Sequence, residues 1–285
     1  MKLISTQRCL IGEGPIWNRW DNKLYYVNAK GKNEIHMVDI ESGDCLVRPL
    51  PFGVAAMGFS ADGRMLVSCD DGAFYLNEDN TRDLLYNPSE YEILYGNDAK
   101  VGPDGRFYIG TQSRKRKGLG NEIDGKLYSI DKNGTVKVLL DGLMLSNGFE
   151  WSLDEKRFYH TDSDTNIIKE YDYDVQTGEL YCTGRQIKVP GVDGFTIGQN
   201  GMLYVACWGQ GHIAVIDTLD LKIQDYILVP TKIPVSCGFA GKDMEQLVIV
   251  TATLGVDLDS DTNAGFTYSC ELGIRGREPY LFGRE

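Results

Sequence analysis

The sequence has no long hydrophobic run and an excess of acidic side chains. Its 285 residues include 41 Asp and Glu against 29 Lys and Arg, which gives a formal net charge of −12 at pH 7. No apolar stretch approaches the ~18 residues of a membrane-spanning helix. Proteins that bind nucleic acid or anionic membranes usually present a basic face. We therefore expect neither nucleic acid nor a membrane as a partner, whereas this acidity is compatible with a bound cation.

Cysteine pairs with metal-binding or redox spacing are also missing. The seven cysteines are odd in number and scattered, and no C-x-x-C pair occurs, which argues against structural zinc and thioredoxin chemistry. A chain of this length needs no disulfide scaffold. The first residues, "MKLISTQRCLIGEG", lack the apolar core and cleavage site of a signal peptide. We expect reduced, mostly buried thiols in a cytoplasmic protein.

The chain has little of what a serine hydrolase requires. It contains only three histidines, at positions 36, 160 and 212, and no G-x-S-x-G elbow. A Ser-His-Asp triad is therefore disfavoured. No segment keeps an apolar period of 3.6 residues, so we predict almost no helix.

What the sequence does contain is a segment that recurs six times. Each copy has a β-prone stretch, a polar turn and a β-branched or aromatic run, and the copies start every 40 to 50 residues. That period is typical of a four-stranded propeller blade. We predict an all-β, six-bladed β-propeller that forms a single domain over residues 1–285. The copies are "GPIWNRWDNKLYYVN", "AMGFSADGRMLVSC", "NDAKVGPDGRFYIGT", "NGFEWSLDEKRFYHT", "DGFTIGQNGMLYVAC" and "SCGFAGKDMEQLVIVT".

A propeller ring needs a closure between its ends. The leading "KLISTQRCL" is predicted to pair with the last blade, which would contain "QLVIVTAT" and "GFTYSCEL", with "REPYLFG" as a further candidate strand. Such pairing joins the chain ends and removes two exposed strand edges.

Polar residues stand at equivalent points just before the innermost strands. They are Glu13, Asn97, Asp98, Asn147 and Asp193, and a glycine follows three of them. Each residue singly also suits a turn, because Asn-Gly and Asp-Gly are common turn formers. Their equivalent positions in different repeats favour convergence at one end of the central tunnel. Carboxylate and amide oxygens gathered there suit Ca²⁺, Mg²⁺ or Mn²⁺.

Five motifs carry a family resemblance. "GEGPIWN…LYYVN", "GNDAKVGPDGRFYIGT", "LSNGFEWSLDEKRFYHTDS", "VDGFTIGQNGMLYVACWGQG" and "PVSCGFAGKDMEQLVIVTA" occur in order between Gly12 and about Thr253. In these motifs the chain resembles the SMP-30/gluconolactonase/luciferin-regenerating-enzyme family (senescence marker protein 30-like). The resemblance implies a six-bladed propeller, in agreement with the repeat count.

The resemblance also implies a site. Glu13, Asn147 and Asp193 would hold one divalent ion, with Ca²⁺ favoured over Mg²⁺, Mn²⁺ or Zn²⁺. Asn97 would lie beside the ion and contact substrate or a bound water. Asp193 would also accept a proton during catalysis, and Asp98 would have a turn or supporting role.

The chain departs from the family pattern where substrate is expected to bind. Sugar-lactonase members typically have Arg two residues before Asn97, and this chain has Tyr95. A Tyr hydroxyl lacks the charged fork of an Arg. The run from Arg114 to Lys117 lies in a loop that is predicted to overhang the site. There it would favour an anionic substrate. The alternative is that the run is simply a solvated loop. Asn121 follows, near a position that contacts substrate in the family.

The function expected from the resemblance is that of a divalent-metal-dependent lactonase, a carboxylic ester hydrolase. Its substrate would be a sugar lactone or related cyclic ester, and the lactone can carry an anionic group. Two alternatives remain open at this point: a phosphotriesterase-like metal hydrolase, and a calcium-binding propeller without catalysis. We expect a monomer or a weak homo-oligomer.

Overall fold

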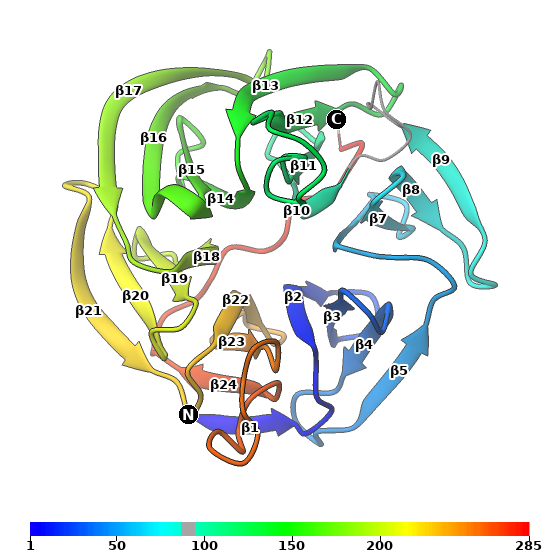
Figure 1. The fold of residues 1–285 in the computed structure, drawn as a ribbon, viewed down its shortest axis with the longest axis vertical. Helices are drawn as coiled ribbons and strands as arrows, with labels where there is room; N and C mark the ends of the chain where they lie inside the picture. The colour runs from blue at the N-terminus through cyan, green and yellow to red at the C-terminus, as the bar shows by residue number, and fades with distance from the viewer. Residues whose placement is uncertain (87–94, 285) are drawn as a thin grey trace.

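The computed structural model of the chain describes residues 1–86 and 95–284. These residues form six four-stranded antiparallel sheets arranged around a central axis (Figure 1). The only helical segment in the described ranges is a single 3₁₀ turn, η1 (Ser163–Thr165). The predicted all-β, six-bladed propeller is thus confirmed. No helix in these ranges is long or apolar enough to cross a membrane.

Each blade takes its strands in chain order from the centre outward, except the last. Blade one contains β2 (Ile11–Asn18), β3 (Lys23–Ala29), β4 (Glu34–Val38) and β5 (Cys45–Pro49), and blade two contains β6 (Ala56–Phe59), β7 (Met65–Cys69), β8 (Gly72–Leu76) and β9 (Arg82–Tyr86). Blade three contains β10 (Gly96–Val101), β11 (Phe107–Thr111), β12 (Gly125–Ile130) and β13 (Val136–Leu143), and blade four contains β14 (Ser146–Trp151), β15 (Arg157–Asp162), β16 (Ile167–Asp174) and β17 (Glu179–Lys188). Blade five contains β18 (Val192–Ile197), β19 (Met202–Cys207), β20 (His212–Asp217) and β21 (Lys222–Leu228), and blade six contains β22 (Pro234–Ala240), β23 (Gln246–Thr251), β24 (Thr267–Glu271) and β1 (Lys2–Ser5).

The burial of the strands follows their distance from the axis. All six residues of β14 are buried and so are all seven of β22, because these strands pack between neighbouring blades. The outer strand β17 has no buried residue. Large aromatic side chains fill the space between blades three and four, where the Trp151 ring lies 4.8 Å from Tyr108 and 5.1 Å from Phe158. Burial of such rings is a main source of core stability.

The ring closes as the sequence predicted. β1 pairs antiparallel with β24, with Lys2 opposite Ser269 and Leu3 opposite Tyr268. The side chain of Ile4 is buried in the core that joins blades one, five and six. The first strand of the chain therefore completes the last blade.

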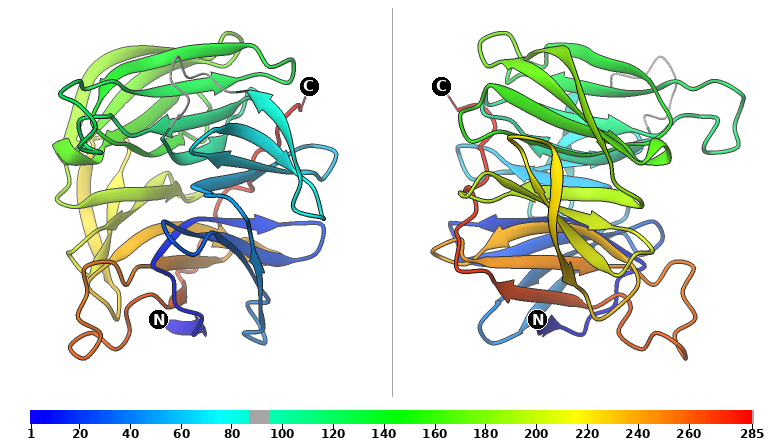
Figure 2. Two further views of the ribbon diagram at one scale, coloured as in Figure 1. Left: turned by 45° about the vertical axis from the view of Figure 1, so that its right-hand side comes forward. Right: turned by 90° about the vertical axis from the view of Figure 1, so that its left-hand side faces the viewer.

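The end of the chain differs from expectation. The segment "REPYLFG" forms no strand, and residues 272–284 instead cross one face of the ring as an extended segment, here called the C-terminal strap (Figures 1 and 2). It contacts all six blades at or beyond the ends of their innermost strands. These contacts are the Arg19–Glu278 ion pair (2.7 Å) and hydrogen bonds from Phe282 N to Phe59 O (2.9 Å), Gly283 N to Gly105 O (2.9 Å), Arg277 Nη1 to Trp151 O (3.0 Å), Gln199 N to Arg275 O (2.7 Å) and Gly276 N to Met244 O (2.8 Å).

Candidate functional site

A β-bulge lies near the start of most innermost strands. The register with the second strand shifts between Glu13 and Ile16, between Gly96 and Ala99, between Asn147 and Phe149, and between Val192 and Phe195. A bulge inserts an unpaired residue and redirects its side chain, and bulges are common beside active sites. Every residue predicted from the repeats to face the tunnel lies in or next to one of these bulges. The starts of the innermost strands share the face opposite the strap, which we call the upper face.

The glycines beside these residues serve two different purposes. Gly14 has a φ of +55°, a conformation that residues with a Cβ rarely adopt. Gly148 and Gly194 have ordinary backbone angles. A Cβ at Gly148 would lie 2.2 Å from Asp193 O, and one at Gly194 would lie 2.2 Å from Ser236 Oγ. These two glycines therefore allow neighbouring innermost strands to approach closely.

Three carboxylates influence one another across the tunnel. Burial first, and then the charges of Asp193 and Asp98, raise the pKa of Glu13 well above its ordinary value. Burial and then the Asp98 charge raise the pKa of Asp193 to about 7. Burial also raises the pKa of Asp98 to about 6. Burial and mutual repulsion make these carboxylates costly to ionise despite the charges of Lys30 and Lys100, and a bound cation would reduce that cost.

The amide of Asn147 supports a cation at the same place. Its Nδ2 donates a hydrogen bond to Asp193 Oδ1, whereas its buried Oδ1 has no hydrogen-bond partner among residues 1–86 and 95–284. Buried polar atoms are nearly always paired, so this oxygen is available to a ligand. Those same residues contain no cluster of three or more His, Cys, Asp or Glu side chains arranged for a metal. The candidate set is instead two carboxylates and one amide oxygen, a donor set that suits a hard cation.

Asn97 is held at both ends of its amide. Nδ2 donates to Ser146 O at 3.2 Å, and Oδ1 accepts from Gln112 Nε2 at 3.0 Å. Gln112 Oε1 in turn accepts from Arg116 Nη1 at 3.4 Å. An amide NH₂ has two protons, so Asn97 keeps one donor for a ligand.

A cavity of about 70 Å³ opens beside Asn97 on the upper face. Its walls come from the first three blades and from the loop after β11. The lining residues include Glu13, Lys30, Asn33, Asp70, Asn97, Gln112 and Lys117. Glu13 and Asn97 therefore meet in one cavity, while Asn147 and Asp193 are joined by their own hydrogen bond.

The sequence model of a protein family, described as the SMP-30/Gluconolactonase/LRE-like region, matches residues 11–253 of this chain. The chain belongs to this family. The match covers the range from Gly12 to about Thr253 in which the sequence motifs resembled the family, and it confirms that recognition.

Relatives in the family align over nearly the whole chain. One relative is YvrE of Bacillus subtilis, whose assignment as a sugar lactone lactonase is itself inferred. It is 31% identical over 96% of this chain and 96% of its own length. Regucalcin of Danio rerio is 30% identical over 95% of this chain and 94% of its own. The crystal structure of regucalcin from Agrobacterium tumefaciens, described as a calcium-binding protein, superposes with a TM-score of 0.87 at 25% identity, covering 99% and 96% of the two chains.

The residues predicted to distinguish this chain within the family lie at different distances from the cavity. Tyr95 does not line the cavity itself, but it contacts two residues that do: Gln112 N donates to its carbonyl oxygen at 3.0 Å, and Lys117 Nζ lies 5.4 Å from the centre of its ring. Arg114 does not line the cavity and pairs with Glu122 and Asp124 inside its own loop. Asn121 is exposed in that loop and is also absent from the lining. The part of the basic run that reaches the cavity is therefore Lys117.

Four polar lining residues were missed by the sequence reasoning, Asn33 and Asp70 as well as Lys30 and Gln112. Lys30 follows β3, and Gln112 follows β11, so both lie where a second strand returns to the upper face. Polar residues at the ends of second strands are the signal that would have found them, because antiparallel neighbours bring these ends beside the starts of the innermost strands.

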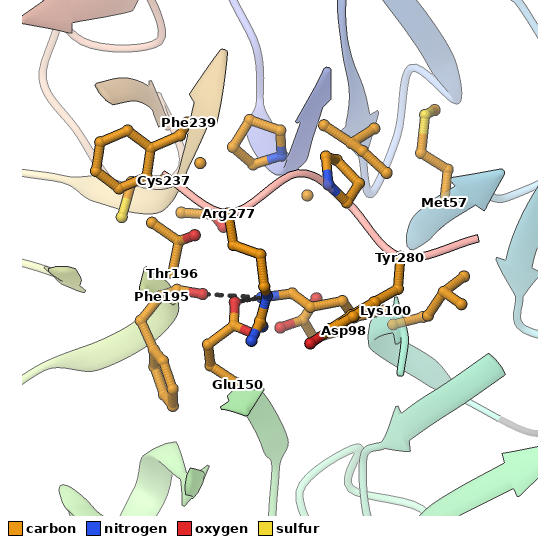
Figure 3. A pocket seen from close by; sticks show the side chains of 18 of the residues that line it. Met57, Asp98, Lys100, Glu150, Phe195, Thr196, Cys237, Phe239, Arg277 and Tyr280 are labelled. Atoms are coloured by element: carbon orange, nitrogen blue, oxygen red, sulfur yellow. Dashed lines mark hydrogen bonds and ion pairs between the residues drawn. The ribbon is translucent and has the colours of Figure 1, made fainter. Parts of the chain in front are cut away.

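A second cavity, of about 80 Å³, lies deeper in the tunnel between Asp98 and the C-terminal strap. Figure 3 shows Arg277 reaching from the strap toward Glu150, with Lys100 beside them. Lys100 Nζ donates to Glu150 Oε2 at 2.9 Å and to Phe195 O at 3.0 Å. Burial alone would raise the pKa of Glu150, but Lys100 and Arg277 hold it below its usual range. This network closes the lower end of the tunnel. Asp98, expected in a turn or supporting role, lies in the wall of this cavity.

Proposed function

We propose that this protein is a lactonase, a carboxylic ester hydrolase that opens a sugar lactone or related cyclic ester. The observation that carries the proposal is the pairing of Asn147 with Asp193 beside Glu13 at the tunnel, in a chain of the gluconolactonase-like family. Support for the reaction class also comes from YvrE, which is named for sugar lactones.

A divalent cation fits the oxygen atoms at this place. Glu13, Asn147 and Asp193 would hold it, because it would neutralise two carboxylates with raised pKa values and satisfy the unpartnered Asn147 Oδ1. Ca²⁺ is favoured over Mg²⁺, Mn²⁺ and Zn²⁺, since the ligands are all oxygen and the Agrobacterium regucalcin is described as calcium-binding. When bound, such an ion supplies Lewis-acid polarisation of the ester carbonyl.

Asp193 is suited to move the proton of the attacking water. Its Oδ1 accepts the Asn147 amide proton, which leaves Oδ2 as the acceptor. As the water oxygen bonds to the carbonyl carbon, Oδ2 takes the proton. When the bond from that carbon to the ring oxygen breaks, Oδ2 returns the proton to the departing alkoxide.

Asn97 is suited to stabilise charge on the carbonyl oxygen. Its contacts to Ser146 and Gln112 fix the plane of the amide, and its second Nδ2 proton remains available. A donor fixed before the reaction stabilises the developing oxyanion without reorganisation, and removing one such donor typically costs about 10²–10³ in rate.

The test is hydrolysis of a panel of sugar lactones by the purified protein, with EDTA and with added Ca²⁺. We expect activity that EDTA abolishes and Ca²⁺ restores. Asp193→Asn should lose about 10³-fold or more in kcat, because it removes both the proton acceptor and a ligand charge. Asp259→Asn, at an exposed acidic loop position, is the matched control and should keep wild-type activity. Wild-type turnover by Asp193→Asn would contradict both roles of Asp193.

A calcium-binding role without catalysis is the second candidate, favoured by the description of the Agrobacterium relative. Calorimetry separates the two. Ca²⁺ binding that Asp193→Asn weakens, together with no turnover of any lactone or phosphotriester, would favour binding alone. Turnover of phosphotriesters but not of lactones would favour the phosphotriesterase alternative.

We also infer that residues 1–285 act as one domain in the cytoplasm. All seven cysteines are free thiols, which suits a reducing compartment.

A further inference from the structure

The upper cavity differs in charge from the rest of this acidic protein. The charged side chains that line it are Glu13, Asp70, Lys30 and Lys117. Glu13 belongs to the candidate cation site, so the remaining wall carries two cations against the single carboxylate of Asp70. The four charged lining groups sum to zero, and once Glu13 is assigned to the cation the rest of the wall carries +1, the reverse of the sign of this chain of net charge −12. Such a reversal beside a reaction centre bears on which ligand charge the site accepts.

Lys117 is held in place by the folding of its own loop. Arg114 binds Asp124 through its backbone N (2.8 Å) and through Nε (2.6 Å), which ties the two ends of the loop together. Lys117 N donates to Ser113 O at 3.2 Å, and its ammonium group lies over the ring of Tyr95. A cation positioned before binding loses less side-chain entropy when an anion arrives.

Lys30 faces the same space from blade one. Burial lowers the pKa of Lys30, and the charges of Lys117 and Arg116 lower it further, although Glu13 opposes them. The three cations are therefore close enough to repel one another. Arg116 is already paired with Asp164 at 3.2 Å. Lys30 and Lys117 form no ion pair with any carboxylate in residues 1–86 and 95–284.

We propose that Lys117 and Lys30 form a subsite for an anionic group on the substrate, so that this chain prefers a lactone carrying a carboxylate or phosphate to a neutral sugar lactone. The subsite rests on the proposed lactonase function. Tyr95 stands where an Arg guanidinium is expected in proteins that bind hydroxyl-rich lactones, so the substrate class of this chain is not settled by that position. The subsite adds anionic lactones as that class.

The test compares matched lactones that differ in one group. D-glucaro-1,4-lactone carries a carboxylate where D-glucono-1,4-lactone carries a hydroxymethyl group, and 6-phospho-D-glucono-1,5-lactone is paired with D-glucono-1,5-lactone. We expect the Ca²⁺-loaded protein to show a kcat/KM at least about tenfold higher for the charged member of one pair. Which pair shows the preference identifies the anion. Added NaCl should reduce the preference, because it screens exposed charges.

Variants assign the preference to the subsite. Lys117→Met and Lys30→Met should each lower the ratio of charged to neutral kcat/KM about fivefold or more, mainly through KM. Lys115→Met is the matched control, since Lys115 is exposed in the same loop and does not line the cavity. It should keep the wild-type ratio.

Two results overturn the subsite: an equal or greater kcat/KM for the neutral member of both pairs, or a preference that Lys117→Met and Lys30→Met leave unchanged. Hydrolysis of no lactone contradicts the proposed function instead. The subsite is then decided by calorimetry with glucarate and gluconate. Tighter binding of glucarate that Lys117→Met weakens and Lys115→Met preserves would support it, and equal binding would overturn it.

Discussion

At the scale of single residues, Asp193 links proton binding to stability. Burial, followed by the Asp98 charge, raises its pKa from 3.8 to about 7 in the ion-free protein. The folded chain therefore keeps a proton that the unfolded chain releases near pH 4. The stability that this proton contributes is complete below about pH 4 and is lost as the pH rises through about 7. Glu13, whose pKa is also raised, acts in the same direction.

The linkage predicts how melting temperature depends on pH and on Ca²⁺. In EDTA, the melting temperature should fall between pH 5 and pH 8, because the carboxylates ionise without a partner. The increase caused by Ca²⁺ should grow over the same range, since the ion competes with protons for the same oxygens. Thermal unfolding in matched buffers measures both. Asp193→Asn should flatten the slope in EDTA, and a Ca²⁺ effect that shrinks as the pH rises would contradict the linkage.

The repeats predicted some of these residues and not others. Glu13, Asn147 and Asp193 were predicted because each stands at the same point of its repeat, and the symmetry of the ring brings equivalent points together. Lys30 and Gln112 share a different point, directly after the second strand of their blades, where the repeat motifs have already ended. Their place in the upper cavity depends on a turn in one blade and a loop in another, which no single repeat encodes. Arg114 was predicted to bind substrate because its basic loop was expected to overhang the site, and in the structure it pairs with Glu122 and Asp124 of that loop.

At the scale of elements, the contacts that hold the C-terminal strap include one buried ion pair. Arg277, whose side chain is 15% exposed, pairs with Glu150, which is 4% exposed. Lys100 shares the same carboxylate at 2.9 Å. Removing one partner of a buried pair leaves a charge uncompensated, at a typical cost of about 3–5 kcal/mol. Lys100 would remain here, so the cost should be lower.

We expect Arg277→Met to lower the free energy of unfolding by about 2–3 kcal/mol. Arg275→Met offers a control on the same strap, because the Arg275 side chain is 61% exposed and pairs with Glu245 at the surface. That variant should cost at most about 1 kcal/mol. Urea unfolding followed by tryptophan fluorescence measures the difference. Equal costs for the two variants would show that the strap does not depend on the Glu150 contact.

The elements themselves were predictable to different degrees. Strands followed from β-branched and aromatic runs, and the turns between innermost and second strands followed from pairs such as Asp104-Gly105, where Asp104 Oδ1 accepts from Arg106 N. The strap was not predicted. "REPYLFG" has the composition of a strand, and only the ring beneath it supplies the partners that hold it in another conformation.

At the scale of the whole molecule, six blades depend on the closure between β1 and β24. Ile4 is 3% exposed in the shared core, whereas its neighbour Leu3 is 45% exposed. We expect Ile4→Ala to lower the melting temperature by about 5–10 °C, because a buried Ile→Ala change costs about 2–5 kcal/mol. Leu3→Ala should change it by no more than about 1–2 °C. A similar, small effect of both changes would mean that the closure contributes little.

The pairing of the first strand with the last also constrains how the chain is made. β1 is made before the other strands of the ring, but its partner β24 is complete only after Glu271 has been added. Blades one to five can form one after another during synthesis, while β1 remains without its pairing partner. Exposed strand edges favour association between chains. A chain that stops before Thr267 therefore releases an open ring, and newly made protein is most vulnerable to aggregation in the interval before β24 is complete.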